Sequence, residues 1–410
     1  MFDDIEIRKQ FPMLKEGKTM QDKPLVFLDN CATTFKPQCV LDAIGNYYTN
    51  TNANAHRGDY DLCFNVDKEV LETRKTVADF VNCDPNEVIF TSGDTESLNL
   101  AIFSFGDKFL KKGDEVLLSE AEHASNLLPW FVLSKKIGVV IKYIPLINGR
   151  ITPEGLKKVI TNKTKVVSVA HIGNVLGYIF DVKSMAKIAH DNGAIIIVDG
   201  AQSVPHIKTD FKDFDLDFLA FSSHKMCGPT GIGCLIGKYH LLEQMNPIIY
   251  GGGMNAKINM DGTFELLPPP ARFEAGTLNL AGIFGLKAAI NFINSIGIDN
   301  IHNHDVELTK YAIKRLKEID DIIVYNPDTE SGVITFNRKG VFSQDEATLL
   351  NASGIAVRSG EHCAKILKDY LGTNATVRAS VYLYTTKKDI DIFIDTLKQG
   401  GDILDAYFSN

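Results

Sequence analysis

The middle of the chain alternates short runs of β-branched and apolar residues with longer segments of helical period. This alternation is typical of parallel strands joined by crossover helices, because strands that are covered on both faces become continuous apolar runs. The sequence therefore predicts an α/β fold with a mostly parallel seven-stranded sheet and helices on both of its faces. The expected strands are Glu87–Thr91, Glu115–Ser119, Val139–Ile144, Val166–Ala170, Ala194–Asp199, Phe218–Phe221 and Gly233–Ile236.

Capping residues place helices between these strands. One helix is expected to begin near Asp94, and a second, Pro153–Ile160, follows Thr152 as its N-cap. A third helix, Val182–His190, is expected to end at Asn192-Gly193, since glycine and asparagine favour the left-handed conformation that closes a helix.

The length of the chain, 410 residues, predicts more than one domain, because single cores stop growing at about 250–300 residues. After about Phe284 the pattern changes to a long helical stretch, Gly285–Ser295, which continues through Ile301–Ile319. We expect a large domain of residues 21–284 and a smaller α+β domain of residues 1–20 and 285–410. The strands expected in the smaller domain are Ile322–Tyr325, Gly332–Asn337 and Ile355–Arg358.

Composition excludes several classes of protein. The net charge is −8 and the basic residues are dispersed, which argues against nucleic acid as a partner. No apolar run reaches the ~18–20 residues that span a bilayer, and residues 1–10 do not resemble a secretion signal, so a cytoplasmic protein is expected. Seven cysteines without a C-x-x-C pair argue against disulfides and a bound metal.

Lys225 and Asp199 are the residues that most strongly suggest chemistry. Lys225 follows a predicted strand and enters a glycine-rich turn, where it could form a Schiff base with pyridoxal phosphate, although a lone loop lysine is usually a surface residue. Asp199 ends a continuous apolar strand, and a carboxylate buried there needs a cation such as the protonated ring nitrogen of pyridoxal. It could instead cap the next helix. Gln202 could reach the phenolic oxygen of the cofactor.

A phosphate site is predicted where a strand meets a helix. The segment Thr91–Ser97 offers backbone N–H groups and the hydroxyl of Thr95, and Ser222 and His224 flank the lysine. Plain helix capping would explain the same glycine and threonine pattern. His123 follows another strand end and could stack on the pyridine ring and exchange protons, although a lone histidine is more often structural.

Taken together, the motifs resemble those of cysteine desulfurases of the class V aminotransferase group, most like the SufS-type (group II) branch. The resemblance covers essentially the whole chain and implies the PLP fold type I, with an aspartate-aminotransferase-like large domain. It rests on Leu28–Thr34, His56-Arg57-Gly58, Gly93–Glu96, Glu122-His123, Gly173–Gly177, Asp199–Gln202, Ser222–Lys225, Arg272–Thr277, Arg358–Ala364 and Arg378-Ala379-Ser380.

The resemblance implies a role for each matched position. Lys225 would carry the cofactor, and Thr277 would reach the phosphate of the neighbouring subunit in a homodimer. Arg378 would grip the substrate carboxylate through two hydrogen bonds. The other implied cofactor contacts are Asp94, Thr95, His123, Asn174, Asp199, Gln202, Ser222 and His224. The other implied substrate contacts are Asn174, Arg358 and Ala32.

Cys363 carries the implied reaction, together with Lys225 and His123 as catalytic residues. In the family this cysteine attacks the sulfur of bound L-cysteine, which leaves a persulfide on the enzyme and alanine as product. His362 and Arg358 are expected to keep the thiolate charged, and Glu361 to oppose them. The sulfur would then pass to a SufE- or SufU-like acceptor protein, for iron–sulfur cluster assembly or other sulfur trafficking.

The chain departs from the family pattern at three places. Glu361 stands where the SufS-type pattern commonly has the first of two histidines. Val341–Gln344 stands where relatives that hand sulfur to a zinc-bearing scaffold protein tend to have a histidine-rich stretch, so that partner is not assumed. Asp94 brings a carboxylate to the expected phosphate site, where it is repulsive unless its side chain turns away.

Two other functions fit the same residues less well. One is selenocysteine lyase or another class V enzyme on this scaffold, which would not need Cys363 to take up sulfur. The other is a non-catalytic assembly subunit, which would be expected to lack Lys225 or Asp199.

Overall fold

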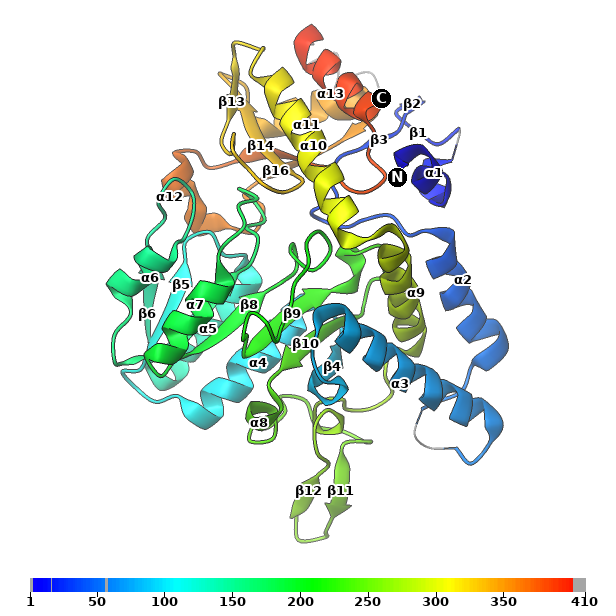
Figure 1. Ribbon diagram of the computed structural model, residues 1–410, viewed down its shortest axis with the longest axis vertical. Helices are drawn as coiled ribbons and strands as arrows, with labels where there is room; N and C mark the ends of the chain where they lie inside the picture. Colours follow the sequence, from blue (N-terminus) through cyan, green and yellow to red (C-terminus); the bar gives the residue numbers. More distant parts are fainter. Residues whose placement is uncertain (1–2, 16, 56–57, 401–410) are drawn as a thin grey trace.

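The computed structural model describes residues 3–15, 17–55 and 58–400. The protein has a larger and a smaller part, and a seven-stranded sheet forms the centre of the larger one (Figure 1). The strand order is β4-β10-β9-β8-β7-β5-β6, and β10 alone runs antiparallel to its neighbours. The predicted mostly parallel sheet is thus confirmed, with each strand within two residues of its expected bounds. The strands are β4 (Val88–Thr91), β5 (Glu115–Ser119), β6 (Val140–Ile144), β7 (Thr164–Ala170), β8 (Ile195–Asp199), β9 (Phe218–Ser222) and β10 (Gly233–Gly237).

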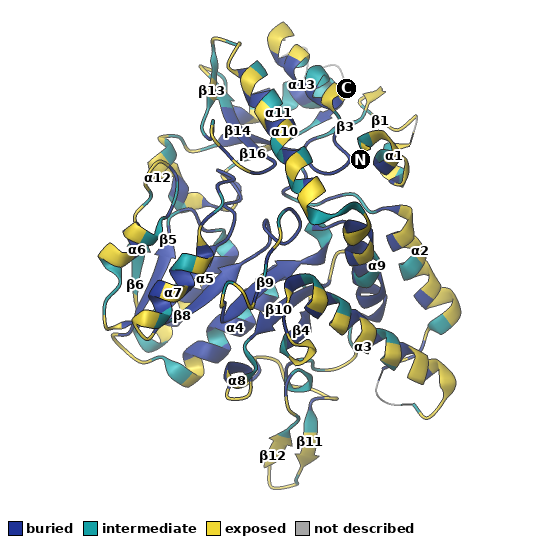
Figure 2. Ribbon diagram, in the orientation of Figure 1, coloured by how far each residue is buried: buried dark blue, intermediate teal, exposed yellow. Residues whose placement is uncertain are grey.

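Helices cover both faces of this sheet, and Figure 2 shows the strands as its buried layer. Successive side chains of a strand point to opposite faces. On β8, Ile196 and Val198 join one apolar cluster with residues of α3, α7 and α9, whereas Ile197 joins a second cluster with residues of α4 and α5. The helices of this part are α2 (Gln38–Asn46), α3 (Asp61–Val81), α4 (Asp94–Phe109), α5 (Ala124–Ile137), α6 (Pro153–Val159), α7 (Val182–Asp191), α8 (Tyr239–Leu242) and α9 (Leu280–Ile296).

The smaller part is built on an antiparallel sheet of order β13-β14-β17-β16, with its own apolar cluster between the sheet and helices α10 and α13. Its strands are β13 (Ile322–Val324), β14 (Val333–Arg338), β16 (Arg358–Gly360) and β17 (Thr376–Ser380). Its helices are α10 (Ile298–Leu316), α11 (Ser343–Ala352), α12 (Lys368–Leu371) and α13 (Lys387–Gln399).

Two elements predicted after Phe284 are wrong in detail. The expected strand Ile355–Arg358 is two strands, because β15 (Ile355–Ala356) pairs in parallel with β3 (Val26–Phe27), whereas β16 pairs with β17. The expected continuous helical stretch breaks at Gly297, whose φ of 90° is a conformation that favours glycine, and α9 and α10 meet there at a bend of 73°.

One predicted domain limit falls inside an element, and residues near the other pack with the smaller part. The limit between residues 284 and 285 lies within α9, and Val26 and Leu28 pack in the apolar cluster of the smaller part. The division at these residues stays a prediction.

The remaining elements are peripheral. The hairpin of β11 (Asn255–Ile258) and β12 (Phe264–Leu266) projects from the body (Figure 1). Helix α1 (Asp4–Lys9) and the strands β1 (Thr19–Met20) and β2 (Lys23–Pro24) lie near the N-terminus. Across the described residues, no single helix combines the length and apolar character needed to cross a bilayer.

Candidate active site

The ends of five sheet strands meet beside one cavity of about 250 Å³. Because β4, β5, β7, β8 and β9 all run in the same direction, the segments that follow them lie at one edge of the sheet. The predicted site residues that line the cavity from this side are Asp94, Thr95, His123, Asn174, Gln202, Ser222, His224 and Lys225. Those that line it from the N-terminal segment and the smaller part are Ala32, Arg358, Cys363 and Arg378.

Lys225 lines the cavity, and Asp199 is buried at the end of the neighbouring strand β8. Lys225 ends the 3-10 turn that follows β9, and Asp199 is the last residue of β8, where its side chain is only 4% exposed. Asp199 does not itself line the cavity, and one of its carboxylate oxygens accepts the N–H of Ala201 at 2.9 Å. Both charges nevertheless act on the pKa of His123, so the amine and the carboxylate lie near the same ring.

The N-terminus of α4 forms one wall with hydroxyl groups around it. The N–H of Asp94 donates to Ser222 Oγ at 2.8 Å, and the hydroxyls of Thr95 and Ser125 are 2.8 Å apart. A Cβ on Gly233 would lie 2.6 Å from the Cα of Gly93, so only glycine allows β10 to approach this turn so closely. Backbone N–H groups of a helix start and two hydroxyls are the groups that bind phosphate.

His123 is a neutral ring whose proton can be assigned. Its Nδ1 accepts the N–H of Ser125 at 3.1 Å, so a neutral ring carries its proton on Nε2. Burial lowers the pKa of His123, with Lys225 and Arg378 adding to the effect and Asp199 opposing it. The ring can therefore donate its Nε2 proton and later take up another, as the predicted proton exchange requires.

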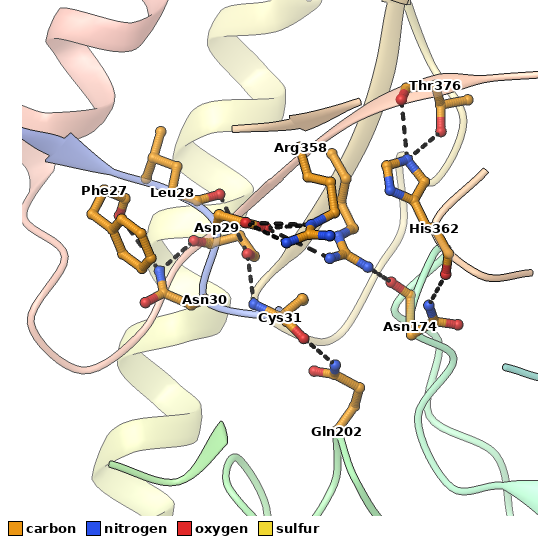
Figure 3. A network of polar contacts seen from close by, with 12 residues as sticks. Phe27, Leu28, Asp29, Asn30, Cys31, Asn174, Gln202, Arg358, His362 and Thr376 are labelled. Carbon is orange, nitrogen blue, oxygen red and sulfur yellow. Dashed lines mark hydrogen bonds and ion pairs between the residues drawn. The ribbon is translucent and has the colours of Figure 1, made fainter. Parts of the chain in front are cut away.

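Two arginines lie on the opposite side of the cavity and share one aspartate. Arg358 donates to both carboxylate oxygens of Asp29, with Nη2 to Oδ2 at 3.0 Å (Figure 3). Arg378 is 3% exposed, donates to the carbonyl of Asn174 at 2.8 Å and lies 3.7 Å from Asp29. Its Nε is buried without a hydrogen-bond partner, so a charged donor remains for a substrate carboxylate.

Cys363 is an exposed thiol at the mouth of the cavity. His362 and Cys363 both adopt positive φ angles, 51° and 57°, in which non-glycine residues are strained. Hydrogen bonds hold this conformation, since the carbonyl of Cys363 accepts from Ala124 N–H and that of His362 accepts from Asn174 Nδ2, both at 2.8 Å.

The predicted electrostatic neighbours of Cys363 need a correction. His362 cannot help to charge the thiolate, because burial and then Arg378 lower its pKa to about 3, and its Nε2 bonds to Thr376 (Figure 3). Glu361 is exposed and pairs with Lys365 at 3.1 Å, so its charge is partly offset. Arg358 remains as the cation that interacts with the Cys363 thiol.

The cavity fits the predicted cofactor. Its buried polar atoms without a partner include Asp94 Oδ1, Asn174 Oδ1 and Arg378 Nε, and such atoms are uncommon unless a ligand satisfies them. An amine, an imidazole and a helix start with hydroxyls line the cavity, and the buried Asp199 carboxylate ends the strand next to that of Lys225, which is the set that pyridoxal phosphate requires.

The structure also places two further predicted residues, Thr277 and Gln202. Thr277 lines a separate pocket with Thr91, Ser92 and Glu96, outside the cavity that holds Thr95. The amide of Gln202 donates to the carbonyl of Cys31 at 2.9 Å (Figure 3). The motif residues His56 and Arg57 lie outside the described part of the chain.

Sequence reasoning did not single out three residues of the site. Asp29 holds the two arginines, Ser125 links Thr95 to His123, and Cys31 lines the cavity as a buried thiol. The position of Ser125 two residues after His123 was a usable signal, because histidine at a helix start can accept from that backbone N–H. Asp29 gave no such local signal, since its partners are more than 300 residues away.

Comparisons with known proteins show which family the chain resembles over nearly its whole length. The family model described as aminotransferase class V matches residues 26–393. A probable cysteine desulfurase of Halalkalibacterium halodurans is 44% identical over 397 residues, which cover 96% of this chain and 97% of that protein. The apo structure of a cysteine desulfurase from Thermococcus onnurineus superposes with a TM-score of 0.92 at 36% identity, covering 97% of this chain and 98% of the other. The Escherichia coli cysteine desulfurase CsdA superposes with a TM-score of 0.90 at 33% identity, with the same coverage.

Proposed function

The chain belongs to the class V aminotransferase family, and from this premise we propose that its cavity takes sulfur from L-cysteine and passes it to Cys363. The activity is that of a cysteine desulfurase, and the cofactor is pyridoxal 5'-phosphate. The observation that carries the proposed role of Cys363 is its exposed thiol at the mouth of the cavity that also holds Lys225 and Arg378.

Different residues in and beside the cavity would bind different parts of the cofactor and the substrate. Lys225 would hold the cofactor, Asp199 its ring nitrogen, and Thr95, Ser222 and His224 its phosphate. When bound, pyridoxal phosphate withdraws electrons from an amino acid joined to it and so weakens the bonds around its α-carbon. Arg378 would bind the substrate carboxylate, with Asn174 and Arg358 beside it, and this fixes which end of the amino acid faces Cys363.

Sulfur transfer is then a displacement at the substrate sulfur. The Cys363 thiolate attacks that sulfur, a sulfur–sulfur bond forms, and the bond between sulfur and the substrate's β-carbon breaks. The carbon fragment keeps the electron pair, takes up a proton and leaves as L-alanine, while Cys363 keeps the persulfide. Arg358 places a positive charge near Cys363, and His123 would supply or accept a proton at Nε2.

A homodimer with shared sites forms part of this proposal. Thr277 lies outside its own cavity, which supports a contact with the phosphate in a second copy of the chain. The hairpin β11–β12 exposes apolar side chains that a second copy could cover, among them Ile258 and Phe264. A cytoplasmic location and a SufE- or SufU-like sulfur acceptor are proposed on the resemblance alone.

Replacing single cysteines tests the proposed function. Cys363→Ser should lower alanine formation from L-cysteine by about 100-fold or more, because serine cannot accept sulfur at this position. Cys39→Ser is the matched control, since Cys39 is also a free and exposed cysteine but lies outside the cavity. A Cys363→Ser protein that releases sulfide from L-cysteine at the wild-type rate would contradict the proposal. A protein active on selenocysteine alone would instead favour a lyase.

A further inference from the structure

Asp94 is a buried acid that the proposed reaction does not use. It is the first residue of α4 and is 6% exposed, and its carboxylate oxygen Oδ1 is buried without a hydrogen-bond partner. The side chain lines the cavity, while its own N–H is already taken by Ser222 Oγ. An ionised carboxylate with a buried and unsatisfied oxygen is costly, whereas a neutral acid has a proton to donate.

The charges around Asp94 favour the neutral form. Of the elements that pack against α4, β8 ends in the Asp199 carboxylate, the turn after β9 brings the Lys225 ammonium, and the start of α5 brings the neutral His123. Strand β10 contributes only the Cys234 thiol, whose pKa burial raises, and β4 has no titratable side chain. Burial first, and then Asp199, raise the pKa of Asp94 well above its ordinary value, with Lys225 opposing them.

Cofactor binding would strengthen this preference. The N-terminus of α4 can stabilise one anion, and a phosphate bound there would compete with an ionised Asp94 for the same backbone dipoles. The ring nitrogen of the cofactor would offset the charge of Asp199, so the repulsion between the phosphate and an ionised Asp94 at the same helix start is the change that favours the neutral acid.

We propose that Asp94 is a neutral carboxylic acid in the cofactor-loaded protein and takes up its proton as the cofactor binds, so that cofactor retention weakens as pH rises. The linkage follows from reciprocity, since a ligand that favours the protonated form binds less tightly where protons are scarce. At pH values where Asp94 is ionised in the cofactor-free protein but protonated in the loaded protein, the dissociation constant for pyridoxal phosphate rises by up to about tenfold per pH unit.

Titration of the apoprotein with pyridoxal phosphate tests this inference. The dissociation constant is measured by the quenching of Trp130 fluorescence or by equilibrium dialysis, from about pH 6 to about pH 9. Asp94→Asn and Asp94→Ser both remove the acid, and serine serves if the amide variant does not fold. Glu96→Gln is the matched control, because it removes a carboxylate from the same first turn whose oxygen accepts Ser92 N–H.

The inference predicts a steeper loss of affinity with pH in the wild type than in either Asp94 variant. Glu96→Gln should change affinity by the same factor at every pH and keep the wild-type slope. Equal slopes in the wild type and both Asp94 variants would overturn the inference, as would a slope that Glu96→Gln also removes. These outcomes leave the sulfur chemistry untouched, because the inference rests on the cofactor and not on Cys363. A protein that binds no pyridoxal phosphate at any pH would contradict the proposed function instead.

Discussion

His171 shows how burial sets the charge of a side chain in this protein. The residue follows β7, is 4% exposed, and contacts the ring of Phe214 edge-on at 5.7 Å between centroids. Burial lowers the pKa of His171 to about 4, and Asp181 opposes the shift only in part. Between about pH 6.5 and this value the unfolded chain binds a proton that the folded protein does not. Acid therefore destabilises the fold through this residue.

Removing His171 should flatten this part of the pH dependence. The wild type is expected to lose about 2 kcal/mol of unfolding free energy through His171 between about pH 7 and about pH 5, and His171→Gln should not lose it. Urea denaturation at the two pH values measures the difference. His240→Gln, at an exposed position, should behave like the wild type. An unchanged pH dependence in His171→Gln would show that the folded protein accepts the proton without cost.

At the residue scale, most of the site was predictable because it follows strand ends. Each apolar run predicted a strand, and the polar residues just after it, such as His123 and Lys225, had to meet at one edge of the sheet. What could not be predicted depends on contacts between distant segments. The neutrality of His362 comes from its burial against Thr376 and Arg378, and the partner of the Gln202 amide is a carbonyl 171 residues away.

At the scale of elements, one buried ion pair connects α3 to the segment after the hairpin. Arg74 on α3 and Glu274 form two hydrogen bonds of 2.8 Å, with side chains 7% and 6% exposed. Glu274 also accepts the N–H of Phe90 on β4 at 2.8 Å. Each charge is stabilised by the other, because both side chains are buried and water cannot solvate one of them if its partner is removed.

Breaking this pair should be far more costly than breaking one at the surface. Arg74→Met is expected to lower the unfolding free energy by about 3–5 kcal/mol, since it leaves the Glu274 carboxylate buried without its cation. Lys187→Met, which breaks the exposed pair with Asp191, should cost less than about 1 kcal/mol. Denaturant titration compares the two. Equal losses in both variants would mean that the buried pair does not stabilise this junction.

Elements were predictable where the pattern was long and regular. Six of the seven central strands are mostly buried and largely apolar, whereas the edge strand β6 is partly exposed. The division of Ile355–Arg358 into β15 and β16 was not visible, because one half pairs with Val26–Phe27, more than 300 residues earlier in the chain. Likewise, Gly297 breaks a helical pattern whose apolar spacing continues on both sides.

At the scale of the whole molecule, the position of Thr277 outside its own cavity predicts that sites are shared between two chains. Mixing subunits tests this. Lys225→Ala and Thr277→Ala proteins, unfolded and refolded together, should form mixed dimers in which one site combines an intact Lys225 with an intact Thr277. That site should retain the cofactor more tightly than either parent protein. A mixture that performs no better than the two variants measured separately would contradict shared sites.

The most direct test of the central claim is mass spectrometry of the protein after incubation with L-cysteine and alkylation, without added reductant. Trypsin releases the peptide Ser359–Lys365, in which Cys363 is the only cysteine. We predict one added sulfur on this peptide, and none on the peptide that contains both Cys31 and the exposed Cys39. Formation of alanine while Cys363 stays free of added sulfur would contradict the claim that this thiol receives the substrate's sulfur.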